Sequence, residues 1–586
     1  MRRLLCITVC VVLAAAACVR KDDKATTVFR NGAVYTVDEN RPWAEAVAVR
    51  GDTIVYVGPD DGVQGYVGPE TEVVDLAGKM LMPGFHDVHM HPSTASVFVH
   101  ECNLYGLYTK EELVARLEEC AAQDRESPWL RGTGWEASTP DSPEQLFKED
   151  LDIISPDRPV YLMDLDGHHA VVNSKALEIV GIDASTEDPV GGIIHRRAGG
   201  EPSGLLIETA AYLPESYAPE VSFEDSLKTL QFAMRKANEY GITTINDAWE
   251  TPERDKVWKH LREQGLLTAR VNLSLLVTET WDEDWDALLA RKLDGDEMLR
   301  AMQVKLLVDG VMENQTAAVK RPYLDTDGNK GLSMFTDEQL NKWIPLFEKH
   351  GFQVHAHTVG DAAVDQVLTA LEASREANGA PNDWPFLIHC YLIDPADYPR
   401  IEAAGATVNF TMLWRQYSES IADLVEPYLT EEQFERLMPM ADAHDYGLVV
   451  TGASDWYVSQ MDPLASVAAA LTGKAVPYYR DEPYDPDGQP VMPGKKPSLE
   501  TMLAAYTING AYASHIEAFT GSIEVGKRAD LIVLERNLFE IPVEQIYGTR
   551  VLMTMLSGKV VYALMTILDG KAVYGTLDSS PAGAGT

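Results

Sequence analysis

The sequence is short of positive charge. Its 586 residues include 49 Lys and Arg against 90 Asp and Glu, which gives a formal net charge of −41 at pH 7. A chain this acidic repels phosphate backbones, so nucleic acid is not an expected partner. The charge indicates a solvated surface and does not identify a binding partner. Apolar residues at 45% and charged residues at 24% are typical of a globular chain with a sizeable core, which excludes wholesale disorder.

Cysteine is scarce as well. Six are present, and only Cys102, Cys120 and Cys390 lie beyond the first 18 residues. Three cysteines cannot build a disulfide framework and contain no CxxC zinc site, so they allow one disulfide at most, with one thiol left over. Cys390 directly follows a histidine of interest, but we expect it to be a small buried residue.

Long apolar runs are missing after the N-terminus, so we expect the rest of the chain to be soluble. The N-terminus has a basic start, Met1-Arg2-Arg3, then an apolar stretch to Ala17 and then Cys18. This pattern resembles a bacterial lipoprotein signal peptide over 1–17, which would leave Cys18 as the lipid-bearing first residue. Ala15 departs from the leucine that such signals prefer, and ordinary secretion is the alternative. The resemblance implies an extracytoplasmic protein anchored through Cys18 to a bacterial membrane, in the periplasm or at the cell surface.

Both ends of the mature chain favour short strands. After a linker at 18–27, turn residues separate the apolar runs of 28–82, and a second strand-rich region covers 516–576. Asn31-Gly32 stands between two apolar runs and predicts a hairpin, and Gly51-Asp52 repeats this pattern. We expect these two regions to form small β units.

The C-terminal region contains a tandem repeat. Val551–Tyr562 and Ala563–Tyr574 match at Leu-Met-Thr, Leu, Gly-Lys, Val and Tyr, and both copies have the form of a hairpin. Two copies cannot make a solenoid, so we infer a duplicated terminal hairpin with one copy surplus to the fold. Ser579–Thr586 are small and polar, and we expect residues 577–586 to form a disordered tail.

The central region, 83–515, alternates apolar runs of strand length with helical patterns. Such alternation predicts βα units around a parallel sheet. The region is longer than a minimal eight-stranded barrel, so we expect insertions, the largest at about 100–215. The predicted strands include 270–277, 303–308, 353–357, 386–389 and 446–451, and the predicted helices include 222–240, 336–349 and 361–377.

Two histidines stand at the start of this region, in Asp87-Val-His-Met-His91. Alternate residues of a strand point the same way, so His89 and His91 would present both imidazoles to one side, as a shared metal needs. An HxH pair alone is more often a chance or surface pair. Its place directly after Leu81-Met-Pro-Gly84 favours a functional role.

Four further polar residues accompany later strands. Lys305 lies within an apolar strand, and His357, His389 and Asp455 lie at strand ends. Each alone is more often structural, and an ion-paired or snorkelling lysine is the plain interpretation of Lys305. The sharper interpretation is a lysine carbamylated by carbon dioxide, which becomes a carboxylate able to bridge two cations. Because the strand ends of a barrel open on one face, these residues together with the HxH pair predict a metal site there.

The order HxH, Lys, His, His, Asp resembles the amidohydrolase superfamily of metal-dependent hydrolases. Over about 28–562 the chain resembles its third family, which includes N-substituted formamide deformylases. Departures from the family's pattern at His86, Leu387–Cys390 and Asn409–Met412 bear on substrate preference more than on metal binding. The segments that carry the resemblance are Asn31-Gly32, Pro83–His91, Asp166–His168 with Asn173-Ser174, Glu201–Gly204 with Glu208, Lys305 with Asp309-Gly310, His357–Asp361 and Gly521–Asp530.

The resemblance implies an α/β fold, a (β/α)8 TIM barrel with insertions and a composite β-sandwich formed from both chain ends. It also implies one or two divalent ions, with zinc expected and iron or manganese as alternatives. His89 and His91 would bind the more buried metal. Carbamylated Lys305 would bridge to a second metal, held by His357 and His389.

Catalytic and substrate-binding roles follow from the same resemblance. Asp455 would contact the first metal and accept the proton of the attacking water. His168 would help to polarise the scissile carbonyl, with a structural role as the alternative. Glu208 and Asn173 are the substrate contacts expected from these motifs. Trp135, in Gly132-Thr-Gly-Trp-Glu136, is a further expected pocket residue that the resemblance does not supply, with core packing as the alternative.

The leading hypothesis is a metal-dependent hydrolase that uses a metal-activated water to cleave a carbon–nitrogen bond other than a peptide bond. Its substrate would be a small amide, N-acyl or N-formyl compound. Hydrolysis of an ester, a lactone or a cyclic amide at the same site is the alternative. A hypothesis from another class is a catalytically silent, ligand-binding lipoprotein. The sequence leaves the substrate and the oligomeric state open, although homodimers are common in the family that it resembles.

Overall fold

The computed structural model describes residues 24–107, 109–135, 142, 144–219, 221–379, 384–477, 484–568 and 571–574. The predicted signal peptide with Cys18, and the predicted tail at 577–586, lie outside the described residues and stay predictions. None of the described helices combines the length and the apolar character that crossing a membrane requires.

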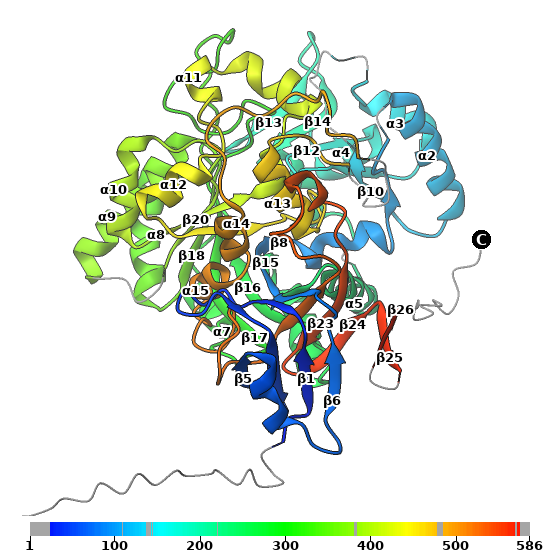
Figure 1. Cartoon of the computed structure of the whole chain (residues 1–586). Helices are drawn as coiled ribbons and strands as arrows, with labels where there is room; N and C mark the ends of the chain where they lie inside the picture. Colours follow the sequence, from blue (N-terminus) through cyan, green and yellow to red (C-terminus); the bar gives the residue numbers. More distant parts are fainter. Residues whose placement is uncertain are drawn as a thin grey trace, which may run out of the picture.

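Eight parallel strands form the central sheet, in the order β21-β20-β19-β18-β17-β16-β15-β8. The sheet is nearly closed, because Asp455 N donates to His89 O at 2.9 Å and Ser454 N donates to Asp87 Oδ1 at 3.1 Å. This arrangement confirms the predicted barrel (Figure 1). The strands are β8 (Phe85–Met90), β15 (Ile242–Glu250), β16 (Arg270–Leu276), β17 (Leu299–Leu307), β18 (Gln353–Thr358), β19 (Phe386–His389), β20 (Thr407–Thr411) and β21 (Val450–Ala453).

Helices alternate with these strands and surround the barrel (Figure 1). Helix α8 shows how the sequence dictates them: Thr336 forms a capping box with Gln339, and apolar residues recur at helical spacing on one buried face. That face packs on α9 and β18, and each large side chain buried there adds roughly 1.5–3 kcal/mol. The helices of this region are α5 (Phe223–Glu239), α6 (Pro252–Glu263), α7 (Trp285–Arg291), α8 (Asp337–Lys349), α9 (Asp361–Asn378), α10 (Tyr398–Ala404), α11 (Glu431–Phe434), α12 (Met440–Tyr446), α13 (Pro463–Thr472), α14 (Leu499–Ala505) and α15 (Ile508–Ala513).

The predicted elements of the barrel agree with the structure to within a few residues, with one exception. The sequence predicts a strand over 446–451, but α12 runs to Tyr446 and β21 begins only at Val450. Gly447 ends the helix with a φ of 104°, a left-handed conformation that glycine adopts without steric cost. The apolar run therefore includes a helix end and a turn as well as the strand.

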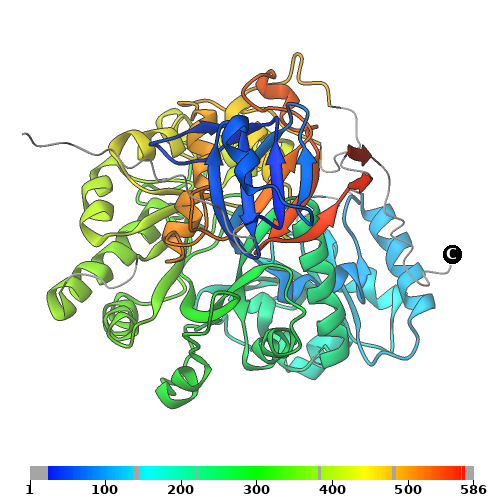
Figure 2. The ribbon, with the colours of Figure 1, turned by 60° about the horizontal axis from the view of Figure 1, so that its bottom comes forward.

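Two sheets pack face to face beside the barrel. One has the order β5-β4-β1-β6, and the other combines strands from both chain ends in the order β24-β23-β22-β7-β2-β3 (Figure 2). Side chains of both sheets, among them Phe29 and Leu531, form one buried cluster, which confirms the composite β-sandwich. Its strands are β1 (Thr27–Arg30), β2 (Ala33–Tyr35), β3 (Trp43–Ala44), β4 (Ala46–Arg50), β5 (Thr53–Gly58), β6 (Glu72–Asp75), β7 (Met80–Pro83), β22 (Leu531–Leu534), β23 (Val551–Leu556) and β24 (Lys559–Ala563), with the short helix α1 (Asp60–Val63).

The hairpin predicted at Asn31-Gly32 is wrong. β1 pairs with β4 and β6, whereas β2 pairs with β3 and β7 in the other sheet. Asn31 adopts a φ of 55°, and the chain uses this turn to cross between the sheets. The turn sequence sets a local reversal but not the sheet that the next strand joins. The Gly51-Asp52 turn does join paired strands, β4 and β5, as predicted.

An inserted lobe separates β8 from β15. Its sheet has the order β13-β14-β12-β11-β10-β9, with a core of its own (cyan region of Figure 1). A disulfide joins Cys102 on β9 to Cys120 on α2. The elements of the lobe are β9 (Cys102–Asn103), α2 (Lys110–Gln123), β10 (Leu130–Trp135), α3 (Lys148–Ile154), β11 (Val160–Asp164), β12 (His169–Val172), α4 (Ser174–Val180), β13 (Gly192–Arg196) and β14 (Pro202–Glu208).

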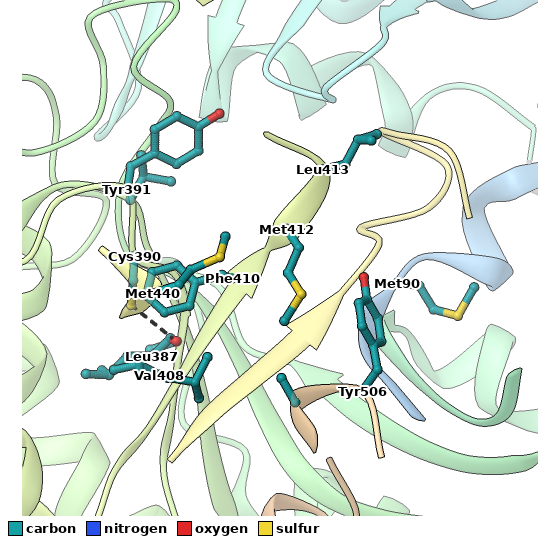
Figure 3. Close-up of a cluster of buried hydrophobic side chains, with 14 of the residues drawn as sticks. Met90, Leu387, Cys390, Tyr391, Val408, Phe410, Met412, Leu413, Met440 and Tyr506 are labelled. Atoms are coloured by element: carbon teal, nitrogen blue, oxygen red, sulfur yellow. Dashed lines mark hydrogen bonds between the residues drawn. The ribbon is translucent and has the colours of Figure 1, made fainter. Parts of the chain in front are cut away.

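Cys390, the free thiol among the described residues, lies in the barrel core (Figure 3). Its Sγ donates to Leu387 O at 3.4 Å, and its neighbours in Figure 3 include Phe410 and Met440. Burial raises the pKa of the thiol to about 12. The prediction of a small buried residue is confirmed, and the thiol has no nucleophilic character.

The tandem repeat forms two separate hairpins. The first copy supplies β23 and β24 to the six-stranded sheet. The second copy forms β25 (Met565–Leu568) and β26 (Lys571–Tyr574), which pair with each other in a sheet of their own. The sandwich sheet is therefore built with only one copy, as the inference of a surplus hairpin expects.

Candidate metal centre and catalytic pocket

Two histidines and one aspartate converge at the carboxyl ends of the barrel strands. His89 lies on β8, His91 directly follows that strand, and Asp455 follows β21. The Nε2 atoms of His89 and His91 lie 3.2 and 3.1 Å from Asp455 Oδ1. The ligand atoms of all three residues lie within 4.8 Å of one another, a spacing that can hold one metal ion.

The other three predicted ligands join this group. Lys305 Nζ, on β17, lies 3.5 Å from His89 Nε2. The ring of His389 lies 4.9 Å from that of His89 and 4.7 Å from that of His357. The barrel therefore brings together all six residues that the sequence suggested, from strands far apart in the chain.

The charge states of these groups suit metal binding. Burial lowers the pKa values of His89 and His357 well below the usual range and that of His389 to about 3, so the rings are neutral. Burial also lowers the pKa of Lys305 to about 7. Burial alone would raise the pKa of Asp455, but His389, His91 and Lys305 outweigh it and hold that pKa below its ordinary value. His89, His357 and His389 thus offer neutral imidazoles beside the ionised carboxylate of Asp455.

Asp455 provides a test of whether these residues fit a metal. Its Oδ1 atom is buried and accepts no well-aligned hydrogen bond from the described residues, although two imidazole nitrogens lie within 3.2 Å. A buried carboxylate oxygen without a donor is costly unless a cation neutralises it. Imidazole nitrogen and carboxylate oxygen are donors that zinc prefers. The donor set therefore fits a divalent metal.

Polar partners that the sequence analysis did not identify hold the predicted ligands in place. Asp309 Oδ1 accepts from His357 Nδ1 at 3.1 Å, and Thr411 Oγ1 lies 2.9 Å from His389 Nδ1. A third partner, His355, lies with its Nε2 2.6 Å from His89 Nδ1. Such partners fix the orientation of metal-binding imidazoles. In the sequence, each of these partners is visible only as a polar residue in or directly after an apolar strand. That position does not reveal which ligand the residue contacts.

Three residues of the site have a backbone conformation that L-amino acids rarely adopt. Glu208, His389 and Asp455 have φ values of 55°, 73° and 55°. Such conformations cost roughly 1–3 kcal/mol each and persist where the surroundings enforce them. All three lie at the end of a strand or just after it, where the side chains of the site come together.

A second charged pair, from the lobe, faces the metal centre. His168 Nδ1 lies 2.6 Å from Glu208 Oε2, and the rings of His168 and His357 are 5.6 Å apart. Burial lowers the pKa of His168, but the Glu208 carboxylate outweighs it and raises that pKa to about 10. His168 is therefore an imidazolium. His169 turns the other way, with its Nδ1 3.0 Å from Asp164 Oδ2.

A cavity of about 660 Å³ lies between the metal centre and the lobe. Barrel residues such as His91 and Asp455 line one wall, and lobe residues such as His168 and Tyr161 line the other. The ring of Trp249, on β15, stacks on the ring of Tyr212, which also lines the cavity, with 5.4 Å between the ring centres. This volume suits a small molecule that reaches both walls at once.

Two expected substrate contacts lie elsewhere. Trp135 is buried in the core of the lobe and does not line the cavity. Asn173 is fully buried, where its side chain caps α4 by accepting from Ala176 N and accepts from Val160 N. Because packing and capping account for both side chains, we leave them out of the proposed substrate contacts. Glu208 reaches the cavity through His168.

Comparison with known proteins adds a family match. The model of a family described as "Amidohydrolase family" matches residues 72–562. This range contains the whole barrel and the lobe, together with the sandwich strands from β6 onward. All six candidate ligands and the His168–Glu208 pair lie within it.

Individual relatives cover nearly the whole chain. Protein LONG AFTER FAR-RED 3 of Arabidopsis thaliana is 30% identical over 553 residues, which cover 92% of each chain. The N-substituted formamide deformylase of Arthrobacter pascens is 28% identical over 548 residues, or 91% of this chain and 97% of that protein. A solved structure, an uncharacterized metal-dependent hydrolase from Pyrococcus horikoshii OT3, has a TM-score of 0.68 at 20% identity and covers 88% of this chain and 99% of its own. This likeness shows the shared fold.

Proposed function

The chain belongs to the amidohydrolase family of metal-dependent hydrolases, and from this premise we propose that it hydrolyses a carbon–nitrogen bond in a small amide, N-acyl or N-formyl substrate. One observation carries the proposal: metal ligands and an ionised carboxylate form one wall of a cavity whose other wall holds a charged donor, His168. Amide hydrolysis needs a nucleophile, a proton acceptor and a donor to the carbonyl oxygen. The deformylase among the relatives acts, by its name, on a bond of this class.

Six residues would hold the metal. A divalent ion at His89, His91 and Asp455 would supply the Lewis acidity that makes water nucleophilic near neutral pH. Carbamylated Lys305 would add an anionic ligand shared with a second ion at His357 and His389. We propose zinc, because it favours imidazole and carboxylate donors.

Burial and charge support the proposed carbamylation of Lys305. Its side chain is 1% exposed, and a pKa of about 7 leaves a large neutral fraction at neutral pH. The lone pair of the neutral amine would attack carbon dioxide: an N–C bond forms as one C–O π bond breaks, and the nitrogen gives a proton to water in the cavity that Lys305 lines, which leaves an anionic carbamate. A carbamate would add a second anionic group beside Asp455 and help to balance the charge of bound cations.

The protein's own groups would then divide the proton chemistry. Asp455 is ionised, so it can take a proton from the attacking water and deliver it to the leaving nitrogen. The His168 imidazolium would donate a hydrogen bond to the substrate carbonyl oxygen, where negative charge develops. Glu208 would keep His168 charged and oriented.

We also propose that the protein works outside the cytoplasm, anchored to a bacterial membrane through a lipid on Cys18. The Cys102–Cys120 disulfide supports an oxidising compartment, because disulfides rarely persist in a reducing cytosol. Metabolic labelling with a clickable palmitate tests the anchor. Label should enter the wild-type protein and be lost from Cys18→Ser, and equal labelling of both would contradict the anchor.

The reaction is tested with Asp455→Asn and a panel of N-formyl and N-acyl amines, each matched with the corresponding ester. Metal content should persist while turnover of the amides falls by roughly 10²–10⁴-fold, the usual contribution of a proton-transfer group. Near-normal turnover would remove Asp455 from the mechanism. Wild-type turnover of the esters alone would reassign the reaction to ester hydrolysis, and wild-type protein without metal or turnover would favour the ligand-binding hypothesis.

A further inference from the structure

A row of polar side chains runs through the barrel interior and ends at His89. Its members lie on neighbouring strands: Ser274 on β16, Gln303 on β17, Gln353 and His355 on β18. Each is less than 5% exposed. Water does not compete at these sites, so each buried donor and acceptor has to find its hydrogen-bond partner within the protein. The direction of every bond can therefore be worked out from one fixed end.

The fixed end consists of two backbone carbonyls, which can only accept hydrogen bonds. Gln353 Nε2 donates to Trp384 O at 2.6 Å and to Ala513 O at 2.8 Å. This sets the orientation of the Gln353 amide and turns its Oε1 towards Gln303. Gln303 Nε2 donates to that oxygen at 2.8 Å, so Gln303 Oε1 in turn faces Ser274 and His355.

Ser274 and Gln303 then determine the tautomer of His355. Ser274 Oγ lies 2.6 Å from Gln303 Oε1, which carries no proton, so the hydroxyl proton belongs to this bond. The serine therefore presents a lone pair to His355 Nδ1 at 3.2 Å, and Gln303 Oε1 presents another at 3.3 Å. Two acceptors face His355 Nδ1, so this nitrogen carries the proton.

The proton on His355 sets the proton on His89. The polar contacts of His355 are Ser274, Gln303 and His89, none of them an anion, and a charged ring buried without a counter-charge is costly. The ring is therefore neutral, and its Nε2 is a bare acceptor that lies 2.6 Å from His89 Nδ1. A bond this short needs one proton, which His89 Nδ1 must supply. His89 Nε2 is then left with a free lone pair.

That lone pair points at the metal centre, with Asp455 Oδ1 at 3.2 Å and Lys305 Nζ at 3.5 Å. We propose that the row from the Trp384 and Ala513 carbonyls through Gln353, Gln303 and Ser274 makes His355 a positioning residue, which fixes His89 in the tautomer whose Nε2 is free to bind metal. His355 is itself no metal ligand, because its own lone pair is used by His89. This inference rests on the proposed metal centre and adds how the protein prepares one ligand before the metal arrives.

A matched pair of variants tests the role of His355. In His355→Gln the amide oxygen can still accept from His89 Nδ1, whereas in His355→Met a side chain of similar shape offers only a weak acceptor. Zinc affinity of the metal-free protein is measured by competition with a chromogenic chelator. We expect His355→Met to bind zinc about 10–100-fold more weakly, the usual effect of losing a ligand's partner, and His355→Gln to retain most of the affinity.

A nearby buried histidine supplies the control. His86 lies on the same strand as His89 and has no hydrogen-bond partner for its ring among the described residues. His86→Met therefore removes a buried imidazole without touching the row, and zinc affinity should stay at the wild-type level. The melting temperature of each metal-free variant separates packing from positioning. Equal zinc affinity in His355→Gln and His355→Met, whether both are normal or both are reduced, would overturn the proposal.

A direct readout covers the case in which His355→Met does not fold. Wild-type metal-free protein labelled with ¹⁵N-histidine should show His89 protonated at Nδ1 and unprotonated at Nε2, with its signals assigned from their loss in His89→Gln. A proton on Nε2 of the folded metal-free protein would overturn the proposal. Failure of wild-type protein to bind zinc at all would instead count against the proposed function, so the two failures are distinguishable.

Discussion

The two walls of the cavity are built in different ways. The metal wall lies at the ends of the parallel strands of a nearly closed barrel sheet. The opposite wall comes from an inserted, mostly antiparallel sheet with its own core and its own disulfide. The difference teaches that metal binding depends on the barrel, while the group that faces the substrate carbonyl depends on the lobe. Damage to one wall should therefore leave the other intact.

The largest effect is expected on the barrel wall, at Lys305. Lys305→Ala removes the amine that would carry the carbamate, so metal content and turnover should both be lost. Addition of a small carboxylic acid such as propionate should restore part of both, because the acid can occupy the place of the carbamate. Metal analysis and turnover check this. Full metal content in Lys305→Ala, with no restoration of turnover by the acid, would contradict the carbamate hypothesis.

On the lobe wall, His168→Gln should separate turnover from metal binding. The change removes the charged donor to the carbonyl oxygen, so kcat should fall by about 10²–10³-fold, as for the loss of one oxyanion donor. Metal content should stay at the wild-type level, because His168 belongs to the other wall. A parallel loss of metal would show that the two walls are not independent.

Glu208→Gln tests the role of the lobe wall through the pH dependence of kcat. In the wild type the pKa of His168 is raised to about 10, so the imidazolium is present at lower pH and is lost as the pH rises through that value. Without the Glu208 carboxylate, burial lowers the pKa of His168. The basic limb of the kcat profile should then move to lower pH, with activity at neutral pH reduced and recovered on acidification. An unchanged basic limb would show that His168 is not the group that limits turnover there.

The smallest effect on chemistry is expected from the disulfide of the lobe. It closes a loop between residues 18 positions apart, and its removal in Cys120→Ser should cost about 3 kcal/mol of unfolding free energy by the loop-closure model. Because the cysteines lie outside the metal wall, metal content of the folded protein should not change. Denaturant melts and metal analysis of the same samples check both statements. A loss of metal from folded protein would couple the lobe to the barrel.

Local sequence patterns predicted most of the barrel. Apolar runs of strand length and capped amphipathic helices, such as the one that Thr336 begins, are local features, and they agree with the structure. The order of the six ligand residues along the chain, each in or next to a predicted strand, could also be read from the sequence. Parallel strands with one common open face convert that order into a site, which is why the residues converge.

The features that the sequence did not reveal share a physical cause, because each depends on long-range partners. Asn31-Gly32 has the sequence of a hairpin turn, yet the strands on its two sides join different sheets. The packing of Trp135 in the lobe core and the capping role of Asn173 likewise depend on neighbouring elements. The pairing of His355 with His89 joins residues 266 positions apart, so no local pattern could show it.

The central claim is that six side chains prepare one metal centre at the barrel mouth. A crystal structure of the wild-type protein, grown with zinc and bicarbonate and measured at the zinc absorption edge, tests it most directly. We expect an anomalous peak between His89 Nε2, His91 Nε2 and the Asp455 carboxylate, with added density on Lys305 Nζ. No anomalous peak at saturating zinc, or imidazoles that turn away from Asp455, would contradict it.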